Sequence, residues 1–408
     1  MPTLGVLSES QFRRYFVGQT TSYLGDGLLP VAISFAVLDL TGSASDLGLV
    51  LAARMVPVVL FLLAGGVWAD RLPRHLVMLG SDIGRGVVQG LLAVLLLSGS
   101  AALWHLLVLQ ALYGIAEAFM RPAASGLLPT IVPGERLQQA NGLMSASVNT
   151  AYIVGPAIAG VLVAAAGSGT AIAIDAGTFA VSTASLALLR IPAMAERAAR
   201  LPFVTDLREG WHEFRSRTWL WATVAGFSFY LLAVISPLMV LGPVVADREL
   251  GGAGAWGAIA AAIGLGALAG SVAAVRIRPA RPILTVCVLL AGPAFTAIAL
   301  ALELPTPVVA VLGFVAGATE GFLEVIWLTA LQERIPAAAL SRVSSYDTLG
   351  SFVFMPVGFA LAGPVADAAG LTATLLGMAG CAVATTLVLA TLPAVRAVRR
   401  PEPRATLA

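Results

Sequence analysis

The sequence predicts an all-α membrane protein in which twelve transmembrane helices form two parallel six-helix bundles. Three observations predict this architecture: an apolar composition, long hydrophobic runs, and a second half that repeats the first. Of the 408 residues, 58% are hydrophobic and 11% are charged, whereas an ordinary soluble domain has about 25% charged residues. A soluble fold of this size cannot hide so much apolar surface, but a bilayer solvates it.

The hydrophobic runs are about 20 residues long, which is enough to cross a bilayer as a helix. They are too long for membrane β-strands and lack sustained alternation of polar and apolar residues, so helices are favoured over a barrel. We expect the spans near 14–38, 47–69, 76–98, 102–121, 137–166, 170–190, 218–246, 254–276, 282–302, 306–328, 343–366 and 371–392.

An internal repeat relates the two halves by a constant offset of 203 residues, close to half the chain length. Parallel halves of this kind are one repeat plan of secondary transporters. The repeat predicts bundles at 1–190 and 218–392, a polar linker at 191–217 and a cytoplasmic tail at 393–408. The matched residues are Gly114, Glu117, Pro133, Gly155, Gly160 and Gly167, followed by Gly317, Glu320, Pro336, Gly358, Gly363 and Gly370.

The linker contains four apolar residues at helical spacing, Val204, Leu207, Trp211 and Phe214. This pattern predicts a short amphipathic helix. Two placements remain open at this point: the helix lies in the cytoplasmic headgroup layer, or it packs under the bundle.

The placement of charge predicts the orientation in the membrane. All 24 basic residues are arginine, and they concentrate at the two termini and in alternate loops, while the other loops carry acids. By the positive-inside rule both termini face the cytoplasm of a multi-pass protein in the inner (plasma) membrane. We therefore expect these arginines to contact membrane lipid headgroups, and we expect no nucleic-acid partner.

The loop after the second span reads Gly66-Val67-Trp68-Ala69-Asp70-Arg71-Leu72-Pro73-Arg74-His75. It resembles motif A of the major facilitator superfamily, with Pro73 in place of a glycine and His75 in place of a basic residue. The resemblance implies a cytoplasmic gate built from Gly66, Asp70, Arg71 and Arg74. Glu117 resembles the family's fourth-helix acid that pairs with this motif. The matching stretch of the second half has Ala274 where Asp70 would be, so the gate looks one-sided.

The fifth span carries Gly155-Pro156 and Gly160, preceded by Gly142 and Ala151. This pattern is similar to the antiporter motif C of the same superfamily, with Ala151 and Ala159 in place of two glycines. The motif accompanies exporters in that family. An ordinary packing helix rich in glycine and proline remains the alternative.

The whole chain resembles the proton-driven drug and siderophore efflux branch of the superfamily, which includes macrolide, tetracycline and enterobactin exporters. The segments that carry the resemblance are Tyr23-Leu24-Gly25-Asp26-Gly27, Ala118-Phe119 with Pro122-Ala123, and Gln332 with Pro336. The resemblance implies proton-coupled antiport of amphipathic small molecules out of the cytoplasm by alternating access.

Asp26 is the leading candidate for proton coupling or for binding a cationic substrate. It lies twelve residues after Arg14, so about 18 Å into the membrane at 1.5 Å per residue. A carboxylate in such a site is costly and tends to be functional. Arg54 lies at a similar depth, so a fixed Asp26–Arg54 ion pair is the alternative.

Further acids lie on spans that line the cavity in the superfamily. Glu320 and Glu324 are one turn apart on the tenth span, and they serve either transport or local pairing with Arg334 or Arg342. Glu117 serves either the gate or transport. Asp82 and Arg85 are expected to pair with each other or with the gate, and Asp175 is expected to be a solvated or packing acid.

The sequence contains no phosphate-binding loop, no nucleophile–base pair and no metal-ligand spacing, so we expect neither an enzyme nor a cofactor. Two other functions remain open: an uptake permease for a small nutrient, and a non-transporting membrane sensor. One chain supplies both halves of a pore, so we expect a functional monomer.

Overall fold

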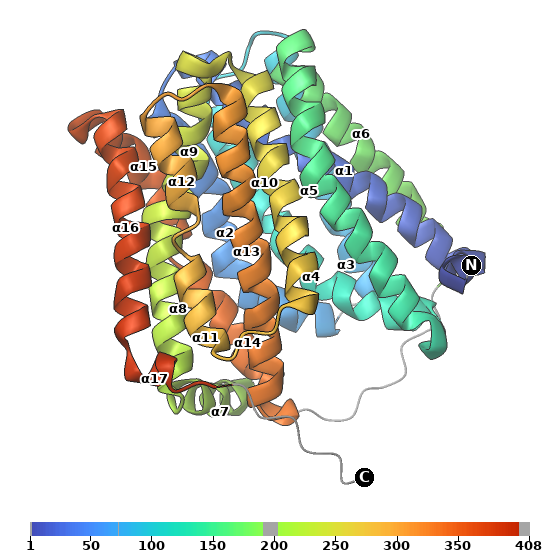
Figure 1. Cartoon of the computed structure of the whole chain (residues 1–408). Helices are drawn as coiled ribbons and strands as arrows, with labels where there is room; N and C mark the ends of the chain where they lie inside the picture. Colours follow the sequence, from blue (N-terminus) through green and yellow to red (C-terminus); the bar gives the residue numbers. More distant parts are fainter. Residues whose placement is uncertain (1, 72, 191–202, 400–408) are drawn as a thin grey trace.

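The computed structural model describes residues 2–71, 73–190 and 203–399, without the side chains of 2–4, 62–71, 121–122, 125, 203–207, 209, 337–338 and 341. The described residues form helices, drawn in Figure 1. The helices of the first half are α1 (Ser10–Thr41), α2 (Ala44–Arg71), α3 (Arg74–Leu97), α4 (Leu103–Ile131), α5 (Leu137–Ala166) and α6 (Ser168–Ala187).

The second half is preceded by α7 (Phe203–Arg215) in the linker. Its helices are α8 (Thr218–Tyr230), α9 (Ser236–Val245), α10 (Ala253–Arg276), α11 (Pro282–Leu289), α12 (Pro293–Ala301), α13 (Thr306–Arg334), α14 (Ala337–Phe352), α15 (Met355–Ala369), α16 (Leu371–Thr391) and α17 (Pro393–Arg396). Short 3₁₀ segments lie at Pro2–Ser8 and Gly134–Arg136, and wider π-helical turns at Leu231–Ile235 and Ala246–Leu250.

Among the described residues, twelve helical segments are long and apolar enough to cross a membrane, which confirms the predicted number of spans. Two spans are each divided into two helices at a proline. The ninth is divided into α11 and α12 just before Pro293, and the eleventh into α14 and α15 just before Pro356. Proline lacks the amide hydrogen that would continue the helical ladder, so an interruption at these points is expected on physical grounds.

The helices of each half pack mainly on one another. In the first half α1 packs on α5 and α6, α3 on α4 and α6, and α2 on α4. In the second half α10 packs on α13, and α12 on α13 and α16. The most extensive contacts between the halves join α5 to α10 and α2 to α15, and Figure 1 shows α5 and α10 side by side.

Glycines bring the α10 and α13 backbones into direct contact. A Cβ atom placed on Gly317 or Gly321 of α13 would lie 1.9 Å from the carbonyl oxygen of Ile263 or Ala267 on α10. Gly266 and Gly270 of α10 are blocked in the same way by carbonyls of α13. Small residues that let helix backbones approach closely are typical of membrane bundles.

The two halves also meet through glycines, at the end of the molecule that carries the α1–α2, α5–α6 and α15–α16 turns. We call this the distal end, and the opposite end, where α7 lies, the linker end (Figure 1). A Cβ on Gly160 of α5 would lie 2.8 Å from the Ala253 carbonyl oxygen of α10. The Ser45 hydroxyl of α2 donates a hydrogen bond to Asp367 of α15 at 3.0 Å. The halves are therefore packed together at the distal end.

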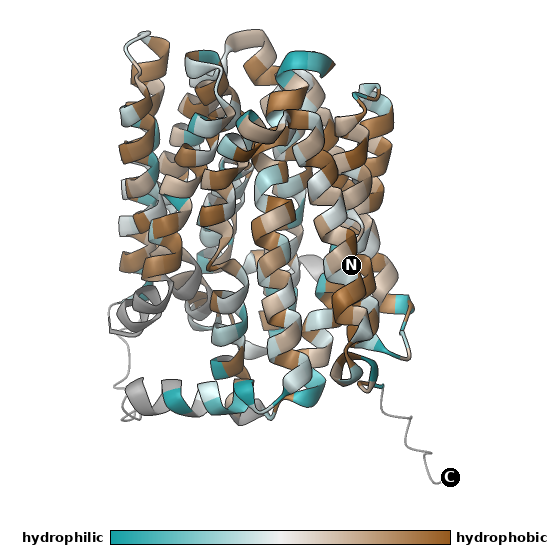
Figure 2. Ribbon diagram, turned by 90° about the vertical axis from the view of Figure 1, so that its left-hand side faces the viewer, coloured by the Kyte–Doolittle hydropathy of each residue, from teal (hydrophilic) through white to brown (hydrophobic). Residues whose placement is uncertain are grey.

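The outward faces of the long helices are apolar. Leu60, Val94, Val161 and Val275 are each more than 60% exposed, and Figure 2 shows hydrophobic residues along the helices. In water such exposure would be unfavourable, but it suits helices that face lipid.

The linker helix α7 packs under the bundle, against α14 and α8. The rings of Trp211 and Phe214 lie 5.5 and 6.0 Å from the ring of Tyr346 on α14. Phe214 is buried, while Trp211 is 48% exposed. The helix α7 is therefore in contact with the bundle through one face, while Trp211 remains half-exposed on the other.

Candidate functional site

The amino-terminal half contains a charged cluster of four acids and two arginines inside an apolar bundle. The acids come from four different helices, and the arginines come from α2 and α3. Burial of charge in a membrane is expensive unless each charge has a partner. The members of the charged cluster are Asp26, Asp82, Glu117, Asp175, Arg54 and Arg85.

Asp26 lies near the middle of α1, and its side chain is 28% exposed. The Tyr113 hydroxyl of α4 donates a hydrogen bond to Asp26 Oδ1 at 2.6 Å. The Arg85 guanidinium of α3 lies 3.3 Å from Asp26 Oδ2. Asp26 therefore pairs with Arg85, and the alternative Asp26–Arg54 pair is not the one that the structure contains.

Arg85 binds two acids at once. Its Nη2 atom lies 2.5 Å from Asp82 Oδ1, which is the pairing expected from their spacing along α3. Asp82 also accepts a hydrogen bond from the Ser182 hydroxyl at 2.6 Å. The guanidinium lies 4.5 Å from the centre of the Phe179 ring, a favourable cation–π distance. Arg85 thus neutralises part of the charge of both Asp26 and Asp82.

Arg54 pairs with Glu117 rather than with Asp26. Its Nε atom donates a hydrogen bond to Glu117 Oε2 at 2.9 Å. The same guanidinium lies 4.7 Å above the ring of Tyr113, the residue that binds Asp26. Tyr113 therefore touches both ion pairs, through its ring on one side and its hydroxyl on the other.

The residues of the predicted gate are described only in part. The side chains of Gly66, Asp70 and Arg71 lie outside the described residues. Arg74 donates a hydrogen bond to the Gly126 carbonyl of α4, so it joins the start of α3 to the linker end of α4.

Asp175 is not the solvated acid considered from the sequence. It is fully buried, and Gln89 of α3 donates a hydrogen bond to its Oδ2 atom at 2.7 Å. The reason is that α6 packs closely on α1 and α3, which covers a residue that lies near a helix end in the sequence.

The acids of the carboxy-terminal half have uncharged partners among the described contacts. Tyr230 of α8 donates a hydrogen bond to Glu320 at 3.3 Å, and Trp327 donates one to Asp347 at 3.0 Å. Glu324 is exposed. Arg334, one of the expected partners of these acids, instead donates to the Arg399 carbonyl at 2.5 Å.

The fifth-span motif connects the charged cluster to the other half. A Cβ on Gly155 would lie 2.5 Å from the backbone of Gly27, the residue after Asp26. One turn further on, Gly160 meets α10, and a Cβ on Gly257 would lie 2.6 Å from the Pro156 carbonyl oxygen. Helix α5 therefore contacts both α10 and the backbone beside Asp26, so a shift of α10 that moved α5 would also displace the backbone next to Asp26.

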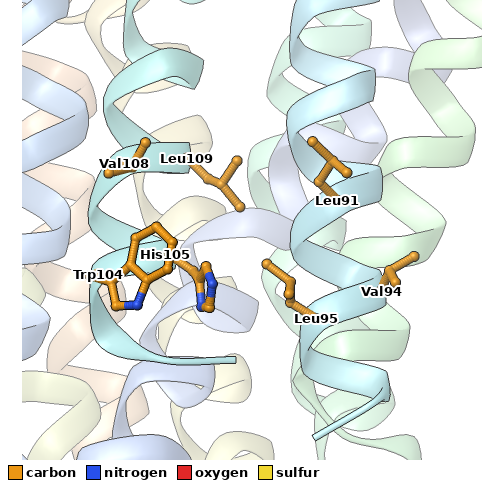
Figure 3. Close-up of a pocket in the computed structure, with 7 residues that line it drawn as sticks. All are labelled: Leu91, Val94, Leu95, Trp104, His105, Val108 and Leu109. Carbon is orange, nitrogen blue, oxygen red and sulfur yellow. The ribbon is translucent and has the colours of Figure 1, made fainter. Parts of the chain in front are cut away.

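An apolar groove of about 280 Å³ lies between α3 and α4. Figure 3 shows its lining residues, Leu91, Val94, Leu95, Trp104, His105, Val108 and Leu109. Leu91, Val94 and Trp104 are more than half exposed, so the groove opens on the outward surface of the bundle. It suits contact with lipid better than a polar site.

Sequence reasoning missed Tyr113 and Gln89 as members of the site. A signal was present for Gln89, because Asp82, Arg85 and Gln89 recur at helical spacing on one face of an otherwise apolar span. For Tyr113 no such signal exists, since a tyrosine in an apolar span is usual.

Residues 15–358 match the family model described as Major Facilitator Superfamily. The chain is 33% identical over 394 residues to the multidrug efflux pump Tap of Mycobacterium tuberculosis, covering 91% of each protein. It is 27% identical over 237 residues to macrolide efflux protein A of Streptococcus pyogenes, covering 58% of each.

Among solved structures, the chain resembles a bacterial homologue of the human lysosomal transporter Spinster in an inward-facing, unoccupied conformation. The TM-score is 0.70 at 15% identity, covering 96% of this chain and 98% of that one. This likeness concerns the fold alone.

Proposed function

Because this chain belongs to the Major Facilitator Superfamily, we propose that it is a proton-coupled antiporter that exports amphipathic small molecules from the cytoplasm. The substrates are drugs or siderophore-like secondary metabolites. The names of the similar proteins, a multidrug efflux pump and a macrolide efflux protein, support export as the direction.

The position and partners of Asp26 are the main support for this proposal. It is an acid near the middle of a helix long enough to span a membrane, and it is exposed enough to exchange with solvent or substrate while Arg85 and Tyr113 hold it in place. A proton and a cationic substrate would compete for this carboxylate. Such competition is a simple mechanism of antiport, since binding of one releases the other.

We propose that the linker end faces the cytoplasm, as the arginine distribution predicts. In this orientation the packed distal end closes the outer side, so substrate would approach from the cytoplasm. Gly66, Asp70, Arg71, Arg74 and Glu117 would then form the gate that closes the linker end in the opposite state.

Alternating access would come from movement of the 1–190 bundle against the 218–392 bundle. The glycine contact between α5 and α10 supports this idea, because small residues let two surfaces meet and separate with little side-chain rearrangement. Gly155, Pro156 and Gly160 would carry the movement to Asp26.

Glu320 and Glu324 on α13 would attract cationic substrates from the second half. We expect Glu320→Gln combined with Glu324→Gln to weaken export of cationic compounds and to leave neutral compounds unaffected. Unchanged export of both classes would remove these acids from the substrate path.

The test of the proposed function uses an efflux-deficient bacterial host that expresses the wild type or Asp26→Asn. Growth and accumulation are recorded with cationic dyes, macrolides, tetracyclines and siderophores. The wild type should lower accumulation of at least one compound, and Asp26→Asn should abolish the effect. Full pH-gradient-driven transport by Asp26→Asn would contradict the role of Asp26.

Asp46→Asn provides the matched control, because Asp46 lies in the first turn of α2 at the distal end and outside the charged cluster. It should transport like the wild type.

A further inference from the structure

Asp175 has no part in the competition between proton and substrate proposed for Asp26, yet it is the acid of the charged cluster with the least compensation. It is fully buried on α6, seven residues after the first residue of that helix. Gln89 donates to one of its carboxyl oxygens, and in the described part of the chain the other oxygen, Oδ1, has no hydrogen-bond partner.

The charges around Asp175 do not balance if every acid is ionised. Among the described side chains of the charged cluster there are four acids and two arginines, and their ion pairs assign Arg85 to Asp26 and Asp82, and Arg54 to Glu117, but include none to Asp175. An ionised carboxylate buried away from a cation is strongly disfavoured, and such a group takes up a proton instead. Asp175 is therefore the acid of this cluster best suited to be neutral.

The partner of Asp175 suits both of its protonation states. The amide of Gln89 carries a donor and an acceptor. Its NH₂ group can donate to an ionised Asp175, and after rotation by half a turn its carbonyl oxygen can accept from a protonated one. Gln89 Oε1 is itself buried without a partner in the described residues, so either orientation uses one end of the amide. An arginine could donate to the carbonyl oxygen of the neutral acid, but it could not accept the hydrogen bond from its O–H group.

Asp175 lies next to the backbone at Asp26. A Cβ on Gly25 would come within 2.4 Å of Asp175 Oδ1 and within 2.2 Å of the Thr178 hydroxyl. The absence of a side chain at Gly25 thus lets α6 place its acid beside the residue that precedes Asp26. The Asp26 and Asp175 carboxylates interact electrostatically, and repulsion between two ionised carboxylates favours a proton on one of them.

Other groups around Asp175 come from every helix near it. Asp26 is on α1, Gln89 and Arg85 are on α3, Arg54 is on α2, and Tyr113 is on α4. Helix α5 contributes no charged residue. In the described ion pairs the two arginines are bound to other acids, Arg85 to Asp26 and Asp82 and Arg54 to Glu117.

We propose that Asp175 is a second proton-binding residue, which holds a proton in the arrangement closed at the distal end and passes it to Asp26 during transport. In that step the O–H bond of the Asp175 carboxyl breaks and a new one forms on the Asp26 carboxylate. Asp175 becomes the carboxylate and Asp26 the neutral acid. The transfer to Asp26 rests on the proposed proton coupling, whereas proton binding by Asp175 does not.

The test measures proton binding and transport separately, with Asp175→Asn as the variant. Asparagine matches the shape of the neutral acid and can still bond to Gln89, but it cannot carry a proton. Infrared spectra of the purified protein in lipid nanodiscs report the C=O stretch of a protonated carboxyl as pH is varied. The wild type should show this band near neutral pH, and Asp175→Asn should lose it while Asp26→Asn keeps it.

Transport is measured in proteoliposomes with a cationic dye. Asp175→Asn should lose uphill transport driven by a pH gradient but retain exchange of labelled for unlabelled dye, because exchange needs no net proton movement. Full pH-driven transport by Asp175→Asn would overturn the transfer to Asp26.

Persistence of the infrared band in Asp175→Asn would overturn the proposal whatever transport shows. If the band belongs to Asp175 but the wild type shows no pH-driven transport, the proton site stands and the proposed proton coupling fails. If Asp175→Asn does not fold, Gln89→Leu replaces it. That variant should shift the band to higher frequency, because the carboxyl loses its hydrogen bond, and an unshifted band would count against the assignment.

Discussion

The two halves share a repeat in sequence but use their interiors differently. In the amino-terminal half Glu117 pairs with Arg54, whereas in the carboxy-terminal half the matching acid, Glu320, accepts a hydrogen bond from Tyr230. The residues 203 and 204 positions after Arg54 are Gly257 and Ala258. Gly257 packs against α5 of the other half. At the position of Arg54 in the repeat, the amino-terminal half therefore has a charged side chain, whereas the carboxy-terminal half has a glycine that contacts the other half.

This difference teaches that a repeated fold does not require repeated chemistry. The amino-terminal half holds the charged cluster, and the carboxy-terminal half holds the α10–α13 contact, in which four glycines lie against carbonyl oxygens of the facing helix. Four comparisons of variants would break or sharpen the contrast.

The largest effect is expected for Arg85→Leu. It leaves the partly exposed Asp26 and the buried Asp82 without their shared cation, and loss of one partner of a buried pair costs about 3–5 kcal/mol. The variant should be scarce in the membrane or should melt far below the wild type when thermal unfolding is followed in detergent. Tyr230→Phe, which removes a single neutral donor from the other half, is the control and should melt near the wild type. Similar melting of Arg85→Leu and the wild type would mean that the charged cluster does not depend on Arg85.

The next largest effect is expected for two glycine substitutions, one at a helix contact within a half and one at a helix contact between the halves. Gly321→Leu inserts a side chain between α10 and α13, where overpacking costs about 1–3 kcal/mol or more, so the melting temperature should fall. Gly160→Leu inserts one between α5 and α10, so it should mainly push the halves apart at the distal end.

A cross-link detects that separation. Cysteines at 45 and 367 replace Ser45 and Asp367, whose side-chain oxygen atoms lie 3.0 Å apart. We expect the two cysteines to form a disulfide when the distal end is closed. Gly160→Leu should lower the yield of this disulfide and Gly321→Leu should not. Equal yields in the two variants would show that the α5–α10 contact does not control closure.

A smaller effect is expected at the repeated acid. Glu117→Gln weakens a hydrogen bond between charged groups, which is worth about 1.5–3 kcal/mol, while Glu320→Gln keeps an acceptor for Tyr230. Thermal unfolding should therefore be more sensitive to the first change than to the second. The reverse order would indicate that the carboxy-terminal acid carries the more important interaction.

The smallest effect is expected outside both bundles. Arg217 pairs with Glu213 at the linker end, in contact with solvent, and exposed pairs of this kind contribute little. Arg217→Ala should melt and transport like the wild type. A clear loss of transport would show that the linker takes part in the movement of the halves.

The number of membrane spans and the presence of a repeat were predictable because both depend only on the order of residues along the chain. Hydropathy is summed over about 20 neighbouring residues, so it needs no knowledge of what the helix packs against. The same property identified Asp26, since an acid inside a long apolar run stands out whatever its partner.

The partners could not be predicted in this way. Arg54 and Arg85 lie on neighbouring spans, and the choice of Arg85 for Asp26 depends on how far each helix is rotated about its axis. The interruptions before Pro293 and Pro356 are similar: proline permits a break, but neighbouring helices decide whether a kinked helix continues.

The sequence by itself determined a twelve-span membrane protein with two related halves and an acid at mid-depth of the first helix. Only the tertiary structure decided that Asp175 is buried and that Gly25 leaves room for it beside Asp26. It also decided that the two arginines pair with three of the four acids of the charged cluster. The physical reason is that hydropathy adds up residue by residue, whereas charge pairing in a membrane depends on contacts between helices far apart in the chain.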